Sequence, residues 1–216
     1  VAGYRKGLKD ERGNLFYEIV RLIDQLKYKP KVLLLENVKN FASHDKGRTL
    51  QILREELESL GYCVFSHVLN TSVYTDIPQN RERTFIICFL EGRDAYLDSS
   101  KPMTNEFRML FPPKKVTSMK DFKKMMNKEV DSKFFYQKDK YMYKDLKEKM
   151  KSKDTFYQWR RQYVRENKNQ VCPTLTANMG TGGHNVPLIL TNNGIRKLTP
   201  KECFLLQGFP KSFKLP

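Results

Sequence analysis

A glutamate directly after a short apolar run is the first sign of chemistry in the sequence. Residues 31–35 end in Val32-Leu33-Leu34-Leu35 and lead into Glu36-Asn37-Val38. A carboxylate at the end of a buried strand is costly to desolvate unless it forms hydrogen bonds. A base with a ring nitrogen and an exocyclic amine would supply them and give Glu36 a role in acid–base chemistry. The structural alternative is an ion pair between Glu36 and a nearby lysine.

Two arginines precede another apolar run. The segment Pro78-Gln79-Asn80-Arg81-Glu82-Arg83 leads into residues 84–90. Because guanidinium groups bind phosphates, base edges and carbonyls through several donors, we expect one arginine to reach a base or phosphate. The other would then hold neighbouring backbone. A salt-bridged sheet edge explains the same spacing equally well.

A glycine-rich loop lies in the C-terminal half, from Asn178 to Asn185, with glycines at positions 180, 182 and 183. Glycines let backbone amides approach a phosphate or a base edge. An ordinary β-turn is the alternative. The loop is not a Walker loop, because no Gly-Lys-Ser/Thr follows it. His184 has no partner at ligand spacing, so we predict no metal site.

Helices and strands must position these residues. Apolar residues at helical spacing predict helices over residues 13–26 and 48–60. Apolar runs predict strands over residues 31–35, 62–69 and 83–90. This alternation predicts an α/β sheet with helices on its faces, in which ligands bind beyond the carboxyl ends of strands. Glu36 lies at such an end.

The following region is basic. Residues 111–150 contain 12 Lys against 6 Asp and Glu, interleaved with aromatic residues and without a clear period. We predict a nucleic-acid surface over residues 114–168, although a lysine-rich run is also typical of a solvated face. The 216-residue chain has 40 Lys and Arg against 24 Asp and Glu, a net charge of +16. This excess favours a polyanionic partner.

Several classes of protein are excluded. No apolar run approaches the roughly 18 residues of a membrane span, so we predict no membrane association. The four cysteines, at positions 63, 88, 172 and 203, form no Cys-x-x-Cys pair. This indicates reduced thiols in an intracellular protein rather than a disulfide framework or a zinc site.

Taken in order, these segments resemble the cytosine-C5 DNA methyltransferases along the whole chain. Residues 2–16 are similar to the stretch after that family's Pro-Cys-Gln loop, and residues 35–38 to its Glu-Asn-Val motif. Gln79, Arg81 and Arg83 match its Gln-x-Arg-x-Arg motif. Residues 173–177 resemble the Thr-Leu signature before its recognition loop, and residues 196–210 the motif that closes its target-recognition region.

The resemblance implies an α/β fold that is part of a Rossmann-like, S-adenosylmethionine-dependent methyltransferase sheet, with an inserted smaller target-recognition domain. It places the C-terminal part of the catalytic α/β domain at residues 1–92. The target-recognition domain follows at residues 93–195. Residues 196–216 return toward the catalytic domain.

The implied reaction is methyl transfer from S-adenosylmethionine to carbon 5 of a cytosine flipped out of a specific site in double-stranded DNA. The enzymes resembled are bacterial restriction-modification methylases, which implies the cytoplasm. A cysteine thiolate adds to carbon 6, Glu36 holds the ring nitrogen and the exocyclic amine, and Arg83 contacts the base carbonyl. The expected catalytic residues are Glu36, Asn37, Gln79, Arg81 and Arg83. The expected DNA-binding residues are Arg160, Arg161, Arg165, Thr174, Leu175, Asn178, Met179, Gly180 and Thr181.

Some family motifs are expected outside this sequence. The Phe-x-Gly-x-Gly cofactor loop and the Pro-Cys-Gln nucleophile would precede Val1, and a Gly-Asn-Ser motif would follow Pro216. We therefore expect a piece of a longer enzyme, inactive when isolated. Three alternatives stay open: one subunit of a two-chain methyltransferase whose second polypeptide carries the cofactor loop and cysteine, a non-catalytic DNA-binding relative, and a tRNA cytosine methyltransferase.

Overall fold

The computed structural model describes residues 14–90, 114–115, 117–140, 142–160, 162–177, 179 and 185–215. The chain divides into two units. The first unit is Val1–Leu69 with Glu82–Pro112, and the second is Asn70–Arg81 with Pro113–Pro216. The second unit thus includes residues 70–81 and 196–216, which the resemblance assigns to the catalytic domain and to the segment that returns toward it. The domain boundaries implied by the resemblance stay a prediction.

The predicted helices and strands of the first 90 residues are confirmed. The helices are α1 (Asn14–Gln25) and α2 (Arg48–Ser59), and the strands are β1 (Val32–Val38), β2 (Tyr62–Asn70) and β4 (Glu82–Leu90). The short 3-10 helices η2 (Lys39–Phe41) and η3 (His44–Gly47) connect β1 to α2. Gly61, at a φ of 92°, makes the left-handed turn from α2 into β2.

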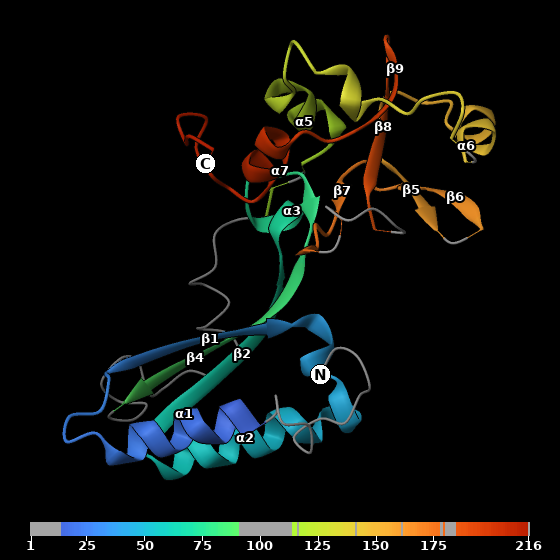
Figure 1. Cartoon of the computed structure of the whole chain (residues 1–216). Coiled ribbons are helices and arrows are strands. Elements are labelled where there is room, and N and C mark those ends of the chain that lie inside the picture. The colour runs from blue at the N-terminus through green and yellow to red at the C-terminus, as the bar shows by residue number, and fades with distance from the viewer. Residues whose placement is uncertain are drawn as a thin grey trace. The chain divides into compact units, whose positions relative to one another are not determined.

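The sheet of the first unit has the order β1-β4-β2, and β1 and β4 are antiparallel. Helices α1 and α2 lie side by side along one face of this sheet (Figure 1). Side chains alternate between the two faces of a strand, so one face of each strand packs on these helices. The buried core consists of Ile23, Phe41, Leu53, Leu57, Tyr62, Val64, Ile86 and Cys88.

The second unit contains two small sheets. Strands β3 (Gln79–Asn80) and β7 (Cys172–Pro173) pair in parallel. The other sheet has the order β6-β5-β8-β9 and is antiparallel. Its strands are β5 (Tyr157–Arg160), β6 (Tyr163–Glu166), β8 (Pro187–Thr191) and β9 (Gly194–Lys197).

Short helices surround these sheets (Figure 1). They are α3 (Thr71–Tyr74), α5 (Met119–Met125), the 3-10 helix η5 (Ser132–Phe134), α6 (Tyr143–Lys149) and α7 (Pro200–Leu206). The aperiodic region at residues 111–150 therefore includes α5 and α6, each of two turns, which is too short for a helical period to show. Among the described residues, no helix is long and apolar enough to cross a bilayer.

Strand β8 connects the two cores of the second unit. Ile189 belongs to a cluster with Phe122, Phe156 and Leu206. The neighbouring Leu188 belongs to a second cluster, with Tyr157 and other residues. Because successive side chains of a strand point to opposite faces, β8 is covered on both sides.

A buried ion pair ties β9 to α7. The Arg196 guanidinium donates from Nη2 to Glu202 Oε1 at 2.7 Å and from Nη1 to Oε2 at 2.8 Å. The Glu202 carboxylate also accepts the backbone N–H of Asn127 at 3.1 Å and of Thr199 at 2.8 Å. The side chains of Arg196 and Glu202 are 2% and 0% exposed. Such a pair is stable only when further hydrogen bonds compensate the loss of water, and the Glu202 carboxylate accepts four here.

Replacing Arg196 with methionine would leave the buried Glu202 carboxylate without its counter-charge. We expect the free energy of unfolding of the second unit to fall by about 3–5 kcal/mol. Urea unfolding can be followed through the fluorescence of Trp159, the only tryptophan of the chain, which is buried in this unit. In the control K133M, an exposed ion pair with Asp131 is lost, and we expect a change under about 1 kcal/mol. Equal unfolding midpoints for R196M and K133M would contradict this role of the ion pair.

Three cysteine thiols are held in the neutral form, since Cys88 and Cys172 are fully buried and Cys203 is half-buried. Burial raises the pKa of Cys88 to about 12, and burial together with the Glu202 charge raises the pKa of Cys203 to about 12. Burial also raises the pKa of Cys172 well above its usual value. All four cysteines are free thiols.

Only the thiolate reacts with iodoacetamide, and at about pH 8 a thiol of pKa near 12 is ionised in about one molecule in ten thousand. We expect Cys88, Cys172 and Cys203 to stay unmodified in the native protein near that pH and to react in concentrated urea. Raising the pH increases the thiolate fraction, so labelling should quicken by about tenfold per pH unit while the fold persists. Peptide mass spectrometry measures each site, and rapid native labelling of Cys88 would contradict the prediction.

Candidate functional site

Glu36 and Arg83 form an ion pair at one end of the first unit's sheet. Val38 of β1 is in register with Arg83 of β4, and Glu36 with Phe85. Since the strands are antiparallel, the start of β4 lies beside the end of β1, and Glu36 and Arg83 are diagonal neighbours on one face. Arg83 Nε lies 2.9 Å from Glu36 Oε1. Glu36 thus pairs with Arg83, one of the residues predicted to share its site.

The two members of the pair differ in exposure. The Arg83 side chain is 17% exposed, and its Nη1 donates to the backbone carbonyl of Glu82 at 2.8 Å. The Glu36 side chain is 45% exposed. Arg83 is therefore held by the protein, while the Glu36 carboxylate remains accessible to a ligand with hydrogen-bond donors.

The turn after β1 is fixed by polar contacts around this pair. Asn37 Oδ1 accepts the backbone N–H of Val38 at 2.9 Å. Thr84 is fully buried, and its hydroxyl lies 3.3 Å from the carbonyls of both Val38 and Lys39. Lys39 pairs with Glu82 at 2.7 Å. Asn37 thus supports the backbone beside Glu36.

Gln79 is fully buried in the second unit. Its amide nitrogen donates to the Leu206 carbonyl at 2.6 Å, and its amide oxygen accepts the Leu175 N–H at 3.2 Å. Both polar atoms of the side-chain amide are therefore hydrogen-bonded to backbone groups. Gln79 joins the end of α7 to the segment that begins at Thr174, so the geometry favours a positioning role within the predicted site.

The backbone of Arg81 is held by Asn70, a residue that the sequence analysis missed. Asn70 Oδ1 accepts the N–H of Arg81 and of Ser72, both at 3.2 Å, and its Nδ2 donates to Asn80 Oδ1 at 2.6 Å. The Arg81 carbonyl accepts the Thr71 N–H at 3.0 Å. An asparagine ahead of Thr71-Ser72 is typical of a helix N-cap, and that signal could have identified it.

The predicted DNA-binding residues of the second unit have different surroundings. Arg165 is exposed on β6, the edge strand, opposite Gln158 of β5. Arg160 is half-buried and donates to Asn185 Oδ1 at 3.0 Å.

The segment before the glycine-rich loop is anchored to the protein. The Thr174 hydroxyl donates to the Asn80 carbonyl at 2.6 Å. Leu175 is 6% exposed and packs in a core cluster, and Met179 packs partly buried against the same cluster. We therefore assign Leu175 to holding this segment in place. Arg161, Asn178, Gly180 and Thr181 lie outside the described residues.

The structure thus brings the predicted site residues together in two groups. Glu36, Asn37 and Arg83 meet in the first unit. Gln79 and Arg81 lie in the second unit with the segment that starts at Thr174. A cavity of about 240 Å³ borders this segment, lined by residues 175–177 and 179 and by the end of α7 with the residues after it, including Phe204 and Gln207.

Comparison with known proteins identifies relatives along the whole chain. The family model for the C-5 cytosine-specific DNA methylases matches residues 1–216. The type II methyltransferase M.Bsp6I of Bacillus sp. (strain RFL6) is 51% identical over 218 residues, covering 100% of this chain and 65% of that protein. The type II methyltransferase M.HhaI of Haemophilus parahaemolyticus is 34% identical over 227 residues, covering 100% of this chain and 63% of that protein. The chain therefore spans somewhat less than two thirds of the length of these relatives.

Solved structures show the same fold. The Dnmt2 methyltransferase of S. pombe matches with a TM-score of 0.64 at 16% identity, covering 98% of this chain and 64% of that one. The methyltransferase EhMeth of Entamoeba histolytica matches with a TM-score of 0.66 at 15% identity, covering 97% and 61%. These matches confirm the predicted α/β methyltransferase fold. With a family model that spans every residue, the chain belongs to the C-5 cytosine-specific DNA methylase family.

Proposed function

We propose that this protein acts as a DNA (cytosine-5-)-methyltransferase that modifies a flipped cytosine in a specific duplex site, as a restriction-modification methylase inside the bacterial cell. The observation that carries the proposal is the ion pair of Glu36 and Arg83, at 2.9 Å, in a chain of the C-5 cytosine-specific DNA methylase family. The relatives M.Bsp6I and M.HhaI are named type II methyltransferases, which supports the same reading.

Glu36 would hold the cytosine. One carboxylate oxygen is bound by Arg83 Nε, and the side chain is accessible enough for a base to reach it. A carboxyl group can share a proton with the ring nitrogen and accept a hydrogen bond from the exocyclic amine. It would thereby stabilise the charge that develops on the ring when a nucleophile adds to carbon 6.

Arg83 would fix the direction of that carboxylate and contact the base carbonyl. Its hold on the Glu82 carbonyl leaves the guanidinium little freedom, so both groups are preorganised before the base arrives. Asn37 would support the backbone beside them. Gln79 and Arg81 would act as positioning residues for the recognition segment.

S-adenosylmethionine would supply the methyl group. Among the described residues, the connections that follow β1 and β2 contain a single glycine, Gly47 at the end of η3, and no glycine-rich loop that could cradle it. We therefore assign no described residue to the cofactor, whose binding residues are proposed to lie in another part of the enzyme or in a second polypeptide. Nor do the buried Cys88 and Cys172 or the half-buried Cys203 suit a nucleophile, since the pKa of each thiol is raised, chiefly by burial.

Double-stranded DNA would be bound by the second unit, in keeping with the net charge of +16. Arg165 is exposed on an edge strand, so its guanidinium is accessible to a phosphate or a guanine. Arg160 and Thr174 would hold the recognition segment through Asn185 and Asn80. The glycine-rich loop, together with Arg161, Asn178, Gly180 and Thr181, remains part of this proposed interface.

Replacing Glu36 with glutamine tests the catalytic assignment. The amide has no ionisable proton to share with the ring nitrogen, so we expect methyl transfer by the complete enzyme to slow by about 100-fold or more. DNA affinity should stay within about twofold, since the change keeps the size of the side chain. Incorporation of labelled methyl groups and fluorescence anisotropy measure the two quantities. The control E82Q makes the same chemical change in an ion pair with Lys39, and an E36Q rate equal to that of E82Q would remove Glu36 from the mechanism.

Replacing Arg165 with alanine tests the DNA interface. Loss of one guanidinium contact should weaken binding of the target duplex by about fivefold or more and lower the salt dependence by about one counterion. Anisotropy titrations at several salt concentrations give both values. R21A removes an exposed arginine of α1 and serves as the control, with unchanged affinity expected. If R165A binds like R21A, Arg165 does not contact DNA.

A further inference from the structure

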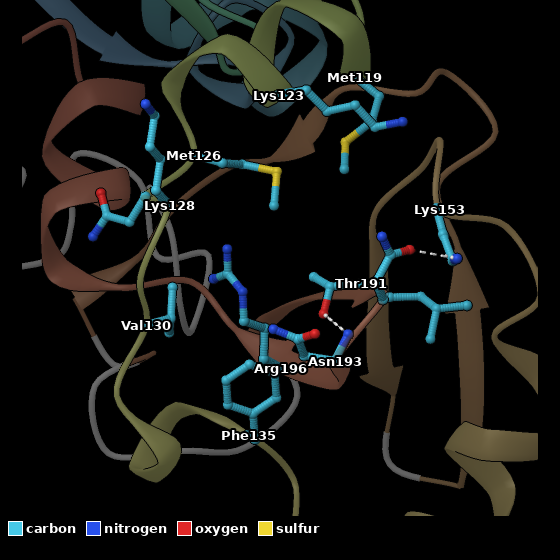
Figure 2. A pocket seen from close by; sticks show the side chains of 13 residues that line it. Met119, Lys123, Met126, Lys128, Val130, Phe135, Lys153, Thr191, Asn193 and Arg196 are labelled. Carbon is cyan, nitrogen blue, oxygen red and sulfur yellow. Dashed lines mark hydrogen bonds between the residues drawn. The ribbon is translucent and has the colours of Figure 1, made fainter.

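The second unit contains a cavity of about 400 Å³ that involves none of the residues named individually above for catalysis or DNA binding, although its lysines belong to the basic region at residues 114–168. Its walls come from α5 and the residues that follow it, from Phe135, from Lys153 and from the turn between β8 and β9 (Figure 2). Cavities that hold small organic groups have volumes of about 300–1,000 Å³. The space is thus large enough for a nucleotide.

The cavity is lined by cations. Lys123, Lys128, Lys153 and Arg196 contribute to its walls, and no carboxylate is among its lining residues. Arg196 is neutralised by Glu202, and Lys123 pairs with Asp154 at the surface. Within the described part of the chain, Lys128 and Lys153 form no ion pair with a carboxylate, and Lys153 donates instead to the neutral amide of Asn192 at 2.7 Å. The surplus of positive charge favours an anionic ligand.

The cations lie on opposite sides. Figure 2 shows Lys128 on one side of the cavity and Lys153 across from it, with Lys123 and Met119 along the upper edge and Phe135 below. A single small anion would be held at one side only. A ligand with anionic groups at both ends of an organic body matches this arrangement, and a nucleotide within a strand has a phosphate on either side of its sugar.

The space between the cations suits a base. Met119 is 2% exposed and Phe135 and Met126 are half-buried, so they offer an apolar surface with one aromatic ring. Bases stack on aromatic side chains without regard to sequence. The side chains of Asn127 and Asn193 add hydrogen-bonding groups to the wall.

The wall is preformed. Within the β8–β9 turn, the Thr191 hydroxyl donates to the Gly194 carbonyl at 2.8 Å and accepts the Asn193 N–H at 3.3 Å. The backbone N–H of Asn127 is held by the buried Glu202 carboxylate. When the wall of a cavity is already ordered, ligand binding costs less conformational entropy than when the wall must become ordered on binding.

The cavity is separate from the residues proposed to contact the target site. It lies at the Thr191 end of β8, whereas β5 pairs with Pro187 and Leu188 at the other end, near the contact of Arg160 with Asn185. A ligand in the cavity and a duplex held through Arg160 and Arg165 therefore occupy different parts of the second unit.

We propose that this cavity is a binding site for an unpaired DNA strand. One nucleotide lies with its base against Phe135 and Met126, and its flanking phosphates face Lys128 on one side and Lys123 and Lys153 on the other. The site binds DNA independently of methyl transfer. It would give the protein a second contact with nucleic acid, free of sequence preference, away from the recognition segment.

The test uses a fluorescent oligothymidine, which contains no cytosine and so cannot occupy the proposed cytosine site. Anisotropy titrations with the full-length protein should show binding that weakens steeply with salt. In K128A/K153A we expect affinity to fall about tenfold or more, and the salt slope to fall by about 1.4, the value for two phosphate contacts on a single strand. F135L should weaken binding about fivefold and keep the salt slope, because it removes a stacking face but no charge.

The matched control is K144A/K147A, which removes two exposed lysines of α6 that do not line the cavity. Equal losses in the two double variants, or no binding of oligothymidine by the native protein, would overturn the proposal. E36Q should bind oligothymidine normally, and K128A/K153A should methylate the target duplex normally. The two readouts therefore separate a failure of this site from a failure of the proposed methyl transfer. Displacement of oligothymidine by an oligoribonucleotide at much lower concentration would show that RNA is the occupant and would overturn the assignment to DNA.

Discussion

The buried ion pair of Arg196 and Glu202 is the interaction on which the second unit depends. Its carboxylate gathers four hydrogen bonds from β9, from the residue that caps α7 and from the segment after α5. Charges removed from water are stable only under such complete pairing, so these three segments have one arrangement in which the pair is satisfied. Because α7 is held in this way, the Leu206 carbonyl at its end is placed to accept a hydrogen bond from the Gln79 amide nitrogen. The Gln79 amide oxygen in turn accepts the Leu175 N–H. A single electrostatic constraint thus extends to the segment that begins at Thr174.

In the first unit, the comparable constraint is the antiparallel direction of β4 relative to β1. Antiparallel pairing of β4 with β1 places Arg83, at the start of one strand, beside Glu36, near the end of the other. The helices α1 and α2 cover the opposite side of the sheet, so the apolar core and the polar pair share the same strands without competing for space. The accessible carboxylate and the immobilised guanidinium are two consequences of this register.

The same buried pair also shapes the cavity in the second unit. Arg196 forms part of its wall, and Asn127, held by Glu202, forms another part. Two of the lysines that give the cavity its charge, Lys123 and Lys128, come from α5 and the residues after it, and the third, Lys153, lies about 25 residues further along the chain. A lysine-rich composition is typical of many solvated surfaces. Here the fold collects a few of those lysines around an apolar floor that contains Phe135.

Composition, periodicity and motif order determined much of this protein. The helices and strands of the first 90 residues follow from apolar spacing, Glu36 follows from its place after an apolar run, and the family resemblance follows from motifs spread along the chain. Spacing could not show α5 and α6, because two turns are too short for a period, nor the burial of Gln79 and Leu175, because core packing depends on residues distant in sequence. The partner of Glu36 was likewise decided by strand direction. Local patterns record which face of an element is apolar, whereas strand pairing and the closure of buried polar networks are set only when segments far apart in the chain meet.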